Sequence, residues 1–176
     1  MAHKAQKEWC LYIKEKFNKY FSDKRVLDIG SMDINGNNKH LFENCEYIGL
    51  DVIEGKNVDV VSIAHEYKTN KLFDVIVSTN ALEHDMYYDL TLKKMVSLLK
   101  PGGLLFFTAG YSYKEHGTIN HKSNDSGTVK LNNKWSSYYK NINKEDILSS
   151  IDLPNIFKKY KLEIFQKDIR FWGIKK

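Results

Sequence analysis

Three side chains stand where they could move a proton. His84 follows the apolar run 73–78, and Glu115 and His116 follow the apolar run 104–108. An imidazole titrates near neutral pH, so both histidines can accept a proton under physiological conditions. If the two runs are parallel strands, their carboxyl ends lie at one edge of a sheet, where ligands bind. We therefore predict His116, His84 and Glu115 as the candidate catalytic residues, with His116 as the first choice for a general base.

Each of these residues also has a plain structural interpretation. His84 could simply brace an N-terminal helix, and Glu115 with His116 could be an exposed pair on a loop. His121 and Asp125, further along the same segment, are weaker candidates for a base. A metal is not expected. The three candidates together with Asp85 could hold a hard cation through carboxylate oxygens, but nothing in their spacing demands it.

A second group of residues has the pattern of a nucleoside site. Val26–Ile29 is a short apolar run that ends at Gly30, which is typical of a buried parallel strand followed by a tight turn. Tyr47–Val52 predicts a second strand, and Asp51 near its end lies 21 positions after Gly30. An acid at that place suits a bidentate hydrogen bond to the two hydroxyls of a ribose.

The glycine pattern argues against a dinucleotide. A pyrophosphate site needs G-x-G-x-x-G, whereas only Gly30 and Gly36 are present in this turn. Asp28-Ile-Gly instead resembles motif I of the class I S-adenosylmethionine (SAM) methyltransferases. Ser31-Met32-Asp33 stands where that family usually has two further glycines, and together with Asn35-Gly36 it resembles the methyltransferase type 11-like branch.

Further motifs carry the resemblance along nearly the whole chain, in the family's order: Tyr47–Asp51, Phe73–His84 and Lys100–Gly103. The resemblance implies SAM as the cofactor and S-adenosylhomocysteine (SAH) as its product. It also places an adenine contact at Ile63–Ala64, where an isoleucine or Ser62 replaces the family's acid. The implied cofactor-binding residues are Asp28, Gly30, Ser31, Met32, Asp33, Asp51, Val52, Ile63, Ala64 and Asn80.

The elements needed to position these residues alternate between strand and helix. The pattern predicts helices at Gln6–Phe21, within 37–44, at Met86–Leu99 with Asp85 as its cap, and at Lys144–Ile151 with Asn143 as its cap. It predicts further strands at Val58–Ile63, Phe73–Ser78, Leu104–Thr108, Phe157–Gln166 and Ile169–Ile174, with a turn at Lys100–Gly103 and another stop at Pro154.

The expected fold is α/β, a Rossmann-like three-layer sandwich. Its seven-stranded sheet should be mostly parallel, with the strand at Arg25–Ile29 central, a crossover helix after each parallel strand, and an antiparallel last strand. We expect residues 1–176 to form a single domain, with an N-terminal helix in 1–22. Residues 111–140 are polar and tyrosine-rich, and a long loop leaving a carboxyl strand end is expected to cover the substrate.

Bulk composition sets broader limits. The chain is 42% hydrophobic with a net charge of +5, two cysteines and no apolar run of membrane-spanning length. These features favour a cytoplasmic protein with a real core and no disulfide scaffold. The positive charge leaves a nucleic-acid partner open, although scattered lysines are more typical of a solvated surface.

The combined expectation is a SAM-dependent methyltransferase of the EC 2.1.1 class that acts on a small polar acceptor. O-methylation of a sugar or glycan hydroxyl is the preferred acceptor chemistry, because the polar, tyrosine-rich loop suits hydroxyl-bearing ligands. The alternatives are a nucleic-acid methyltransferase and a non-catalytic SAM-binding partner subunit. The sequence does not name the acceptor, decide between oxygen and nitrogen, or give an oligomeric state.

Overall fold

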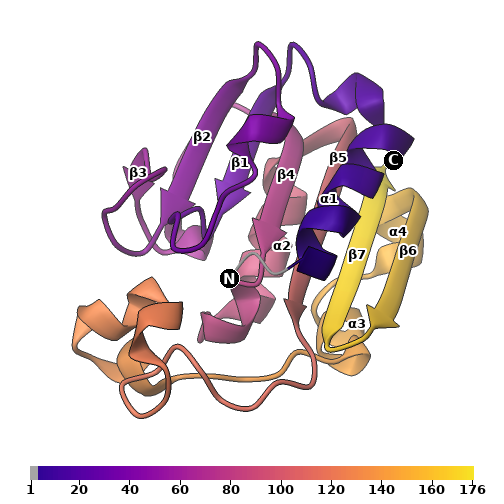
Figure 1. Cartoon of the computed structure of the whole chain (residues 1–176). Coiled ribbons are helices and arrows are strands. Elements are labelled where there is room, and N and C mark those ends of the chain that lie inside the picture. Colours follow the sequence, from indigo (N-terminus) through magenta and orange to yellow (C-terminus); the bar gives the residue numbers. More distant parts are fainter. Residues whose placement is uncertain (1–3) are drawn as a thin grey trace.

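One mixed sheet organises residues 4–176, the part of the chain that this computed structural model describes. Its strand order is β3-β2-β1-β4-β5-β7-β6 (Figure 1). The neighbours among β1 to β5 pair in parallel, whereas β7 is antiparallel to both β5 and β6. The strands are β1 (Arg25–Ile29), β2 (Glu46–Asp51), β3 (Val60–Val61), β4 (Phe73–Thr79), β5 (Leu99–Gly110), β6 (Phe157–Phe165) and β7 (Asp168–Lys175). The expected fold class is confirmed.

Alternating apolar side chains give the sheet a core on each face. In β4, Val75 and Val77 belong to the core on one side, and Ile76 belongs to the core on the other. Phe106 and Phe107 of β5 divide in the same way. Successive side chains of a strand point to opposite faces, so these continuous apolar runs require a covering layer on both sides.

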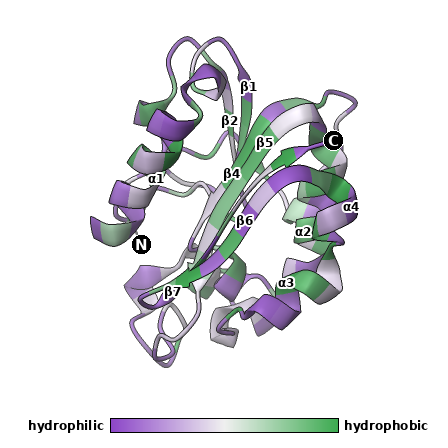
Figure 2. Cartoon of the chain, turned by 90° about the vertical axis from the view of Figure 1, so that its right-hand side faces the viewer, coloured by the Kyte–Doolittle hydropathy of each residue, from purple (hydrophilic) through white to green (hydrophobic). Residues whose placement is uncertain are grey.

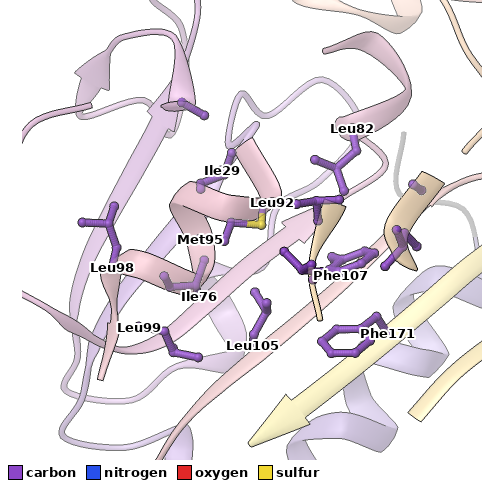
Figure 3. Close-up of a cluster of buried hydrophobic side chains, with 14 of the residues drawn as sticks. Ile29, Ile76, Leu82, Leu92, Met95, Leu98, Leu99, Leu105, Phe107 and Phe171 are labelled. Atoms are coloured by element: carbon purple, nitrogen blue, oxygen red, sulfur yellow. The ribbon is translucent and has the colours of Figure 1, made fainter. Parts of the chain in front are cut away.

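Helices supply the two covering layers. α1 (Lys4–Lys16) lies on one side of the sheet, and α2 (Tyr88–Leu98), α3 (Lys144–Ser150) and α4 (Leu153–Ile156) lie on the other (Figure 2). Leu92 and Met95 of α2 lie among the buried side chains of the sheet, with Met95 near Ile76 (Figure 3). In the described residues, no helix combines the length and apolar character needed to cross a bilayer.

Two expectations about the sheet are wrong. β4, not β1, occupies the middle of the strand order, with β1 beside it. Crossover helices do not follow every parallel strand, because the connection after β1 contains only the 3₁₀ turn Lys39–Leu41 and the one after β3 only Ala64–Glu66. Segment 31–40 is rich in Asn, Asp and Gly, which favour turns over helix. The expected third strand shrinks to Val60–Val61 at the sheet edge.

Other boundaries shift for local reasons. The expected turn at Lys100–Gly103 lies inside β5, where Gly102 has φ +76° and its carbonyl accepts a hydrogen bond of 2.6 Å from the Tyr20 hydroxyl. Pro154 was expected to end the helical region but lies in the first turn of α4, where the missing N–H costs no helical hydrogen bond. Asn143 caps α3 as expected, in a reciprocal capping box with Asp146.

Segment 111–140 has more structure than the sequence indicated. It contains the 3₁₀ turns Ser123–Asp125, Gly127–Leu131 and Lys134–Ser137. Figure 1 shows it as the orange segment folded beyond the carboxyl ends of β1, β2 and β4. The chain thus leaves β5, crosses the edge of the sheet at which these strands end, and returns to α3.

Candidate active site

A cleft opens at the carboxyl ends of β1, β2 and β4. It encloses about 910 Å³ of space, its open mouth included. It is lined by the end of β1 and the turn that follows, residues 28–32 and 34–38, and by segment 125–128 and Trp135. The site lies where the switch of strand order between β1 and β4 predicts a ligand crevice.

Asp51 ends β2 and lines this cleft. One carboxylate oxygen accepts the Met32 N–H at 3.0 Å, and the other accepts the Ile53 N–H at 3.4 Å. Burial raises the pKa of the Asp51 carboxyl, while these N–H groups oppose the rise. The carboxylate therefore fastens the turn after β1 to the tip of β2 within the lining of the cleft.

Gly30 occupies a position in this turn where a side chain would be strained. Its φ is +74°, and a Cβ built there would lie 2.2 Å from the Cβ of Ala81. The Gly30 N–H bonds the Leu50 carbonyl at 2.9 Å. The glycine predicted from the sequence therefore permits both a left-handed turn and close contact between the β1 and β4 loops.

Asp28 is a buried acid beneath the cleft. The Tyr47 hydroxyl donates a hydrogen bond to its carboxylate. Burial raises the pKa of Asp28 to about 7, the Tyr47 bond lowers it in part, and the charge of Asp51 raises it further. Asp28 is thus close to a change of protonation at neutral pH.

Two of the residues assigned to the cofactor by resemblance do not line the cleft. The Asp33 carboxylate accepts bonds from the Gly36 N–H at 2.7 Å and the Asn37 side chain at 2.8 Å, and it pairs with Lys56 at 3.1 Å. It therefore shapes the turn. Ile63 precedes a 3₁₀ turn and is also absent from the lining, which contains its neighbours Ser62 and Ala64.

The remaining predicted cofactor residues, namely Ser31, Met32, Val52 and Asn80, all line the cleft. Asn80 has φ +50° and joins the site to a buried polar layer behind it. Its side-chain oxygen accepts the Thr108 hydroxyl at 2.5 Å, and its amide lies 3.4 Å from Asp168, which pairs with Arg170 at 3.9 Å.

Segment 111–140 reaches the cofactor turn directly. Ser126, Gly127, Thr128 and Trp135 belong to the cleft wall, and a Cβ added to Gly127 would lie 2.8 Å from the Met32 sulfur. Sequence reasoning gave this segment a covering role without identifying these residues. The contact between Gly127 and Met32 depends on tertiary packing that no local pattern indicates.

His84 forms part of the cleft wall beside a cluster of rings. Its ring centroid lies 5.3 Å from that of His116 and 5.5 Å from that of Tyr139. His116 also packs at 4.8 Å on Tyr139 and at 5.6 Å on Tyr113. Burial, followed by the nearby His116, lowers the pKa of His84 to about 3, so its imidazole is neutral at physiological pH.

Glu83 lies next to these histidines and was missed by sequence reasoning. Its side chain is fully buried, and burial raises the pKa of its carboxyl to about 7. The N–H groups of Glu83 itself and of Gly110 oppose this rise, but neither reaches hydrogen-bond geometry. In the chain Glu83 lies between Leu82 and His84, and this local pattern does not indicate that its carboxylate is enclosed.

The other predicted catalytic residues are placed unevenly. His116 is half-buried behind His84 and is not in the cleft wall, while its Nδ1 bonds the Lys114 carbonyl at 3.0 Å. Glu115 is exposed, and its carboxylate accepts the Thr118 hydroxyl at 2.8 Å. Asp85 bonds the Tyr87 N–H at 2.8 Å near the start of α2 rather than occupying its N-cap position.

The charge of the cleft differs from that of the chain. Four acids line it, namely Asp28, Asp51, Asp85 and Asp125, and no lysine or arginine of residues 4–176 does. The whole chain carries a net charge of +5. An acidic cleft suits a cationic ligand and repels phosphate groups.

A methyltransferase-domain family model matches residues 1–164. The chain belongs to this family. It is therefore a methyltransferase domain of the EC 2.1.1 class, as the motifs predicted. Among curated proteins, (S)-coclaurine N-methyltransferase of Papaver somniferum is 35% identical over 100 residues. That match spans 46% of this chain and only 28% of the plant enzyme.

Solved methyltransferases share the fold at low identity. The 1,6-didemethyltoxoflavin-N1-methyltransferase of Burkholderia thailandensis, crystallised with its acceptor and SAH, has a TM-score of 0.66 at 12% identity. The similarity covers 98% of this chain and 78% of that one. N-methyltransferase NodS of Bradyrhizobium japonicum WM9, crystallised with SAH, has a TM-score of 0.61 at 14% identity over 98% and 88% of the two chains. SAH in such sites is consistent with SAM as the cofactor.

Proposed function

We propose that this chain transfers the methyl group of SAM to a small polar acceptor bound between the cofactor cleft and segment 111–140. The observation that carries the proposal is Asp51, a carboxylate at the tip of β2 that faces the acidic cleft. Such an acid pairs with the two hydroxyls of a ribose. The cleft offers no cation in the described residues for a dinucleotide's pyrophosphate.

The residues present fit SAM. Asp51 would hold the ribose hydroxyls, and the turn around Gly30 and Ser31 would take the methionine part through backbone atoms. Asp28 and the other acids favour a cationic group in this cleft. Ser62 and Ala64, rather than Ile63, would flank the adenine. When bound, SAM would supply a methyl group attached to a sulfonium. The rest of SAM then leaves as a neutral thioether, so the leaving group needs no acid catalyst.

The protein's own work is then alignment, exclusion of water and removal of one proton. Segment 125–128 and Trp135 close the cleft, which restricts the acceptor to one approach. We assign proton removal from an acceptor hydroxyl to His116. The neutral imidazole of His84 lies between His116 and the cleft. With its pKa lowered to about 3, His84 is a poor base, and we assign it to the wall of the acceptor space.

A sugar hydroxyl is our first candidate acceptor. The rings of Tyr113, His116 and Tyr139 cluster beside His84 and would pack against the apolar face of a sugar ring, and the two tyrosines carry hydroxyl groups. The acidic cleft favours a neutral acceptor over a phosphorylated one, and this argues against a nucleic acid.

An amine is the second candidate, and a separate observation favours it. Glu83, Asp125 and the nearby rings would attract an ammonium group by charge and by cation–π contact. The named relatives are N-methyltransferases by title. An amine must be deprotonated before it attacks, so His116 would serve as the base for this acceptor as well.

Release of SAH from SAM, measured by mass spectrometry, tests the function. Neutral glycans, amino sugars, small amines, sugar nucleotides and RNA should be offered separately, with SAM alone as the blank. Turnover with a neutral glycan or a free amine is expected, and the methylated atom is then located by fragmentation. Turnover confined to RNA would overturn the small-acceptor proposal. SAM binding without turnover on any acceptor would favour the non-catalytic partner subunit.

A further inference from the structure

Three side chains of metal-binding type converge next to the cleft. Glu83 and His84 belong to the 3₁₀ turn after β4, and His116 comes from the segment after β5. One ligand atom from each lies within 4.8 Å of the other two. Two imidazoles and a carboxylate are the donor set that binds zinc at many catalytic sites.

The two buried members are not satisfied by the rest of the described chain. Glu83 is 0% exposed and His84 is 6% exposed. Neither carboxylate oxygen of Glu83, nor Nδ1 of His84, forms a hydrogen bond with any residue between 4 and 176. A buried polar group without a partner costs roughly 1–3 kcal/mol, so such groups usually mark an ion, a water or a function.

The third member has the support that metal-bound histidines need. The Nδ1 of His116 bonds the Lys114 carbonyl at 3.0 Å, which leaves Nε2 as the nitrogen available to a ligand. A backbone carbonyl in this position fixes the ring and raises its basicity. The Tyr139 ring packs on both histidines.

We propose that Glu83, His84 and His116 bind one divalent transition-metal ion, with zinc as the ion that this donor set favours. Ligand atoms held at about 2.0–2.2 Å around a tetrahedral ion lie roughly 3.4 Å apart. The ligand atoms now lie within 4.8 Å of one another, so side chains must rotate to bring them to that spacing, chiefly the half-buried His116. His84 lines the cleft, so the fourth position of the ion would open toward it.

A catalytic role for this ion rests on the proposed function, whereas the metal site itself does not. An acceptor hydroxyl in the fourth position would lose its proton more easily, because a bound cation stabilises the alkoxide. With its Nε2 bound to the ion and its Nδ1 bonded to the Lys114 carbonyl, His116 would no longer act as the base, so the proton would pass to solvent and the oxygen would remain as the nucleophile. Binding of the ion does not require that methyl transfer occurs.

Zinc titration of the metal-free, tag-free chain against a chromophoric chelator tests the site. The wild type should bind one Zn²⁺ per chain, and His116→Ala should bind it at least about 100-fold more weakly. His121→Ala removes an exposed histidine of the same segment and should bind zinc as the wild type does. Cys45→Ser, which removes a partly exposed thiol, should also leave the affinity unchanged.

Folding and function are read out separately. His116→Ala is chosen because this side chain is only half-buried, and unchanged SAM affinity in calorimetry would show an intact fold. No zinc binding by the wild type, or equal binding by His116→Ala, would overturn the metal site. Zinc binding that depends on His116 in a chain that releases no SAH would keep the site and remove the proposed function.

Discussion

Asp51→Ala is the sharpest test of the cofactor site. The substitution removes a carboxylate that faces the cleft and also accepts the Met32 N–H at 3.0 Å. If Asp51 holds the ribose, the variant loses charge-assisted hydrogen bonds to two hydroxyls. It also releases one attachment of the turn that carries Gly30 and Ser31.

The size of the effect follows from these contacts. A hydrogen bond to a charged group contributes about 1.5–3 kcal/mol, and 1.4 kcal/mol corresponds to a factor of ten. Losing one ribose bond should therefore weaken SAM binding roughly 10- to 150-fold. Losing the second ribose hydrogen bond should weaken SAM binding by a smaller factor, because the ribose can then shift and its hydroxyls can bond water. Asp51 is only partly exposed to solvent, and its hydrogen bonds join the turn after β1 to the end of β2, so a small loss of stability is also expected.

Isothermal titration calorimetry with SAM measures this loss. Asp51→Asn keeps an oxygen for the Met32 N–H but removes the charge, so it separates ribose binding from support of the turn. Asp89→Ala, which removes a partly exposed acid on α2 outside the cleft, is the surface control and should bind SAM normally. Unchanged affinity in both Asp51 variants would refute the assignment. NAD binding tighter than SAM binding by the wild type would refute the cofactor itself.

Other substitutions test the remaining parts of the site. Gly30→Ala should destabilise the fold by roughly 2–5 kcal/mol, because it combines a φ of +74° with a 2.2 Å contact to the Ala81 Cβ. In thermal unfolding, the double variant with Ala81→Gly should recover the part of this lost stability that the steric clash causes. His116→Ala should lower turnover about 10²- to 10⁴-fold with SAM affinity retained, and His84→Ala should lower it less; the reverse order would make His84 the base. Asp28→Asn should stabilise the chain by at most roughly 4 kcal/mol above pH 7. The pKa of Asp28 is about 7 in the folded state and 3.8 in the unfolded state, so the stability of the wild type falls as the pH rises between these two values. A stability difference between the two proteins that stays constant across pH 4–8 in denaturation experiments would contradict this.

Local sequence patterns account for most of the fold. The runs that became β1 and β4 are apolar, short and bounded by turn residues, and both are fully enclosed in the sheet. Asn143 and Asp146 form their capping box within one helical turn, so the start of α3 needed no tertiary information. Such features are decided by neighbours in the chain, and the sequence contains all of them.

The elements that the sequence did not predict depend on distant contacts. A helix was expected in 37–44, but the side chains there bond to the turn after β1 and to β4, as Asn38 does with Thr79 at 3.0 Å. The enclosure of Glu83 requires Gly110 and Tyr139, which come from β5 and from the far end of segment 111–140. No periodicity near residue 83 signals contacts over such separations.

The distribution of charge explains why composition alone was a poor guide to the acceptor. The net charge of +5 left a nucleic-acid partner open, yet Lys158, Lys159 and Lys161 lie exposed on the edge strand β6, away from the cleft. At physiological ionic strength, charges more than about 8 Å apart across solvent are largely screened. A ligand in the cleft therefore experiences mainly Asp28, Asp51 and the other acids around it. The local charge favours SAM and a neutral or cationic acceptor, whereas the net charge describes the rest of the surface.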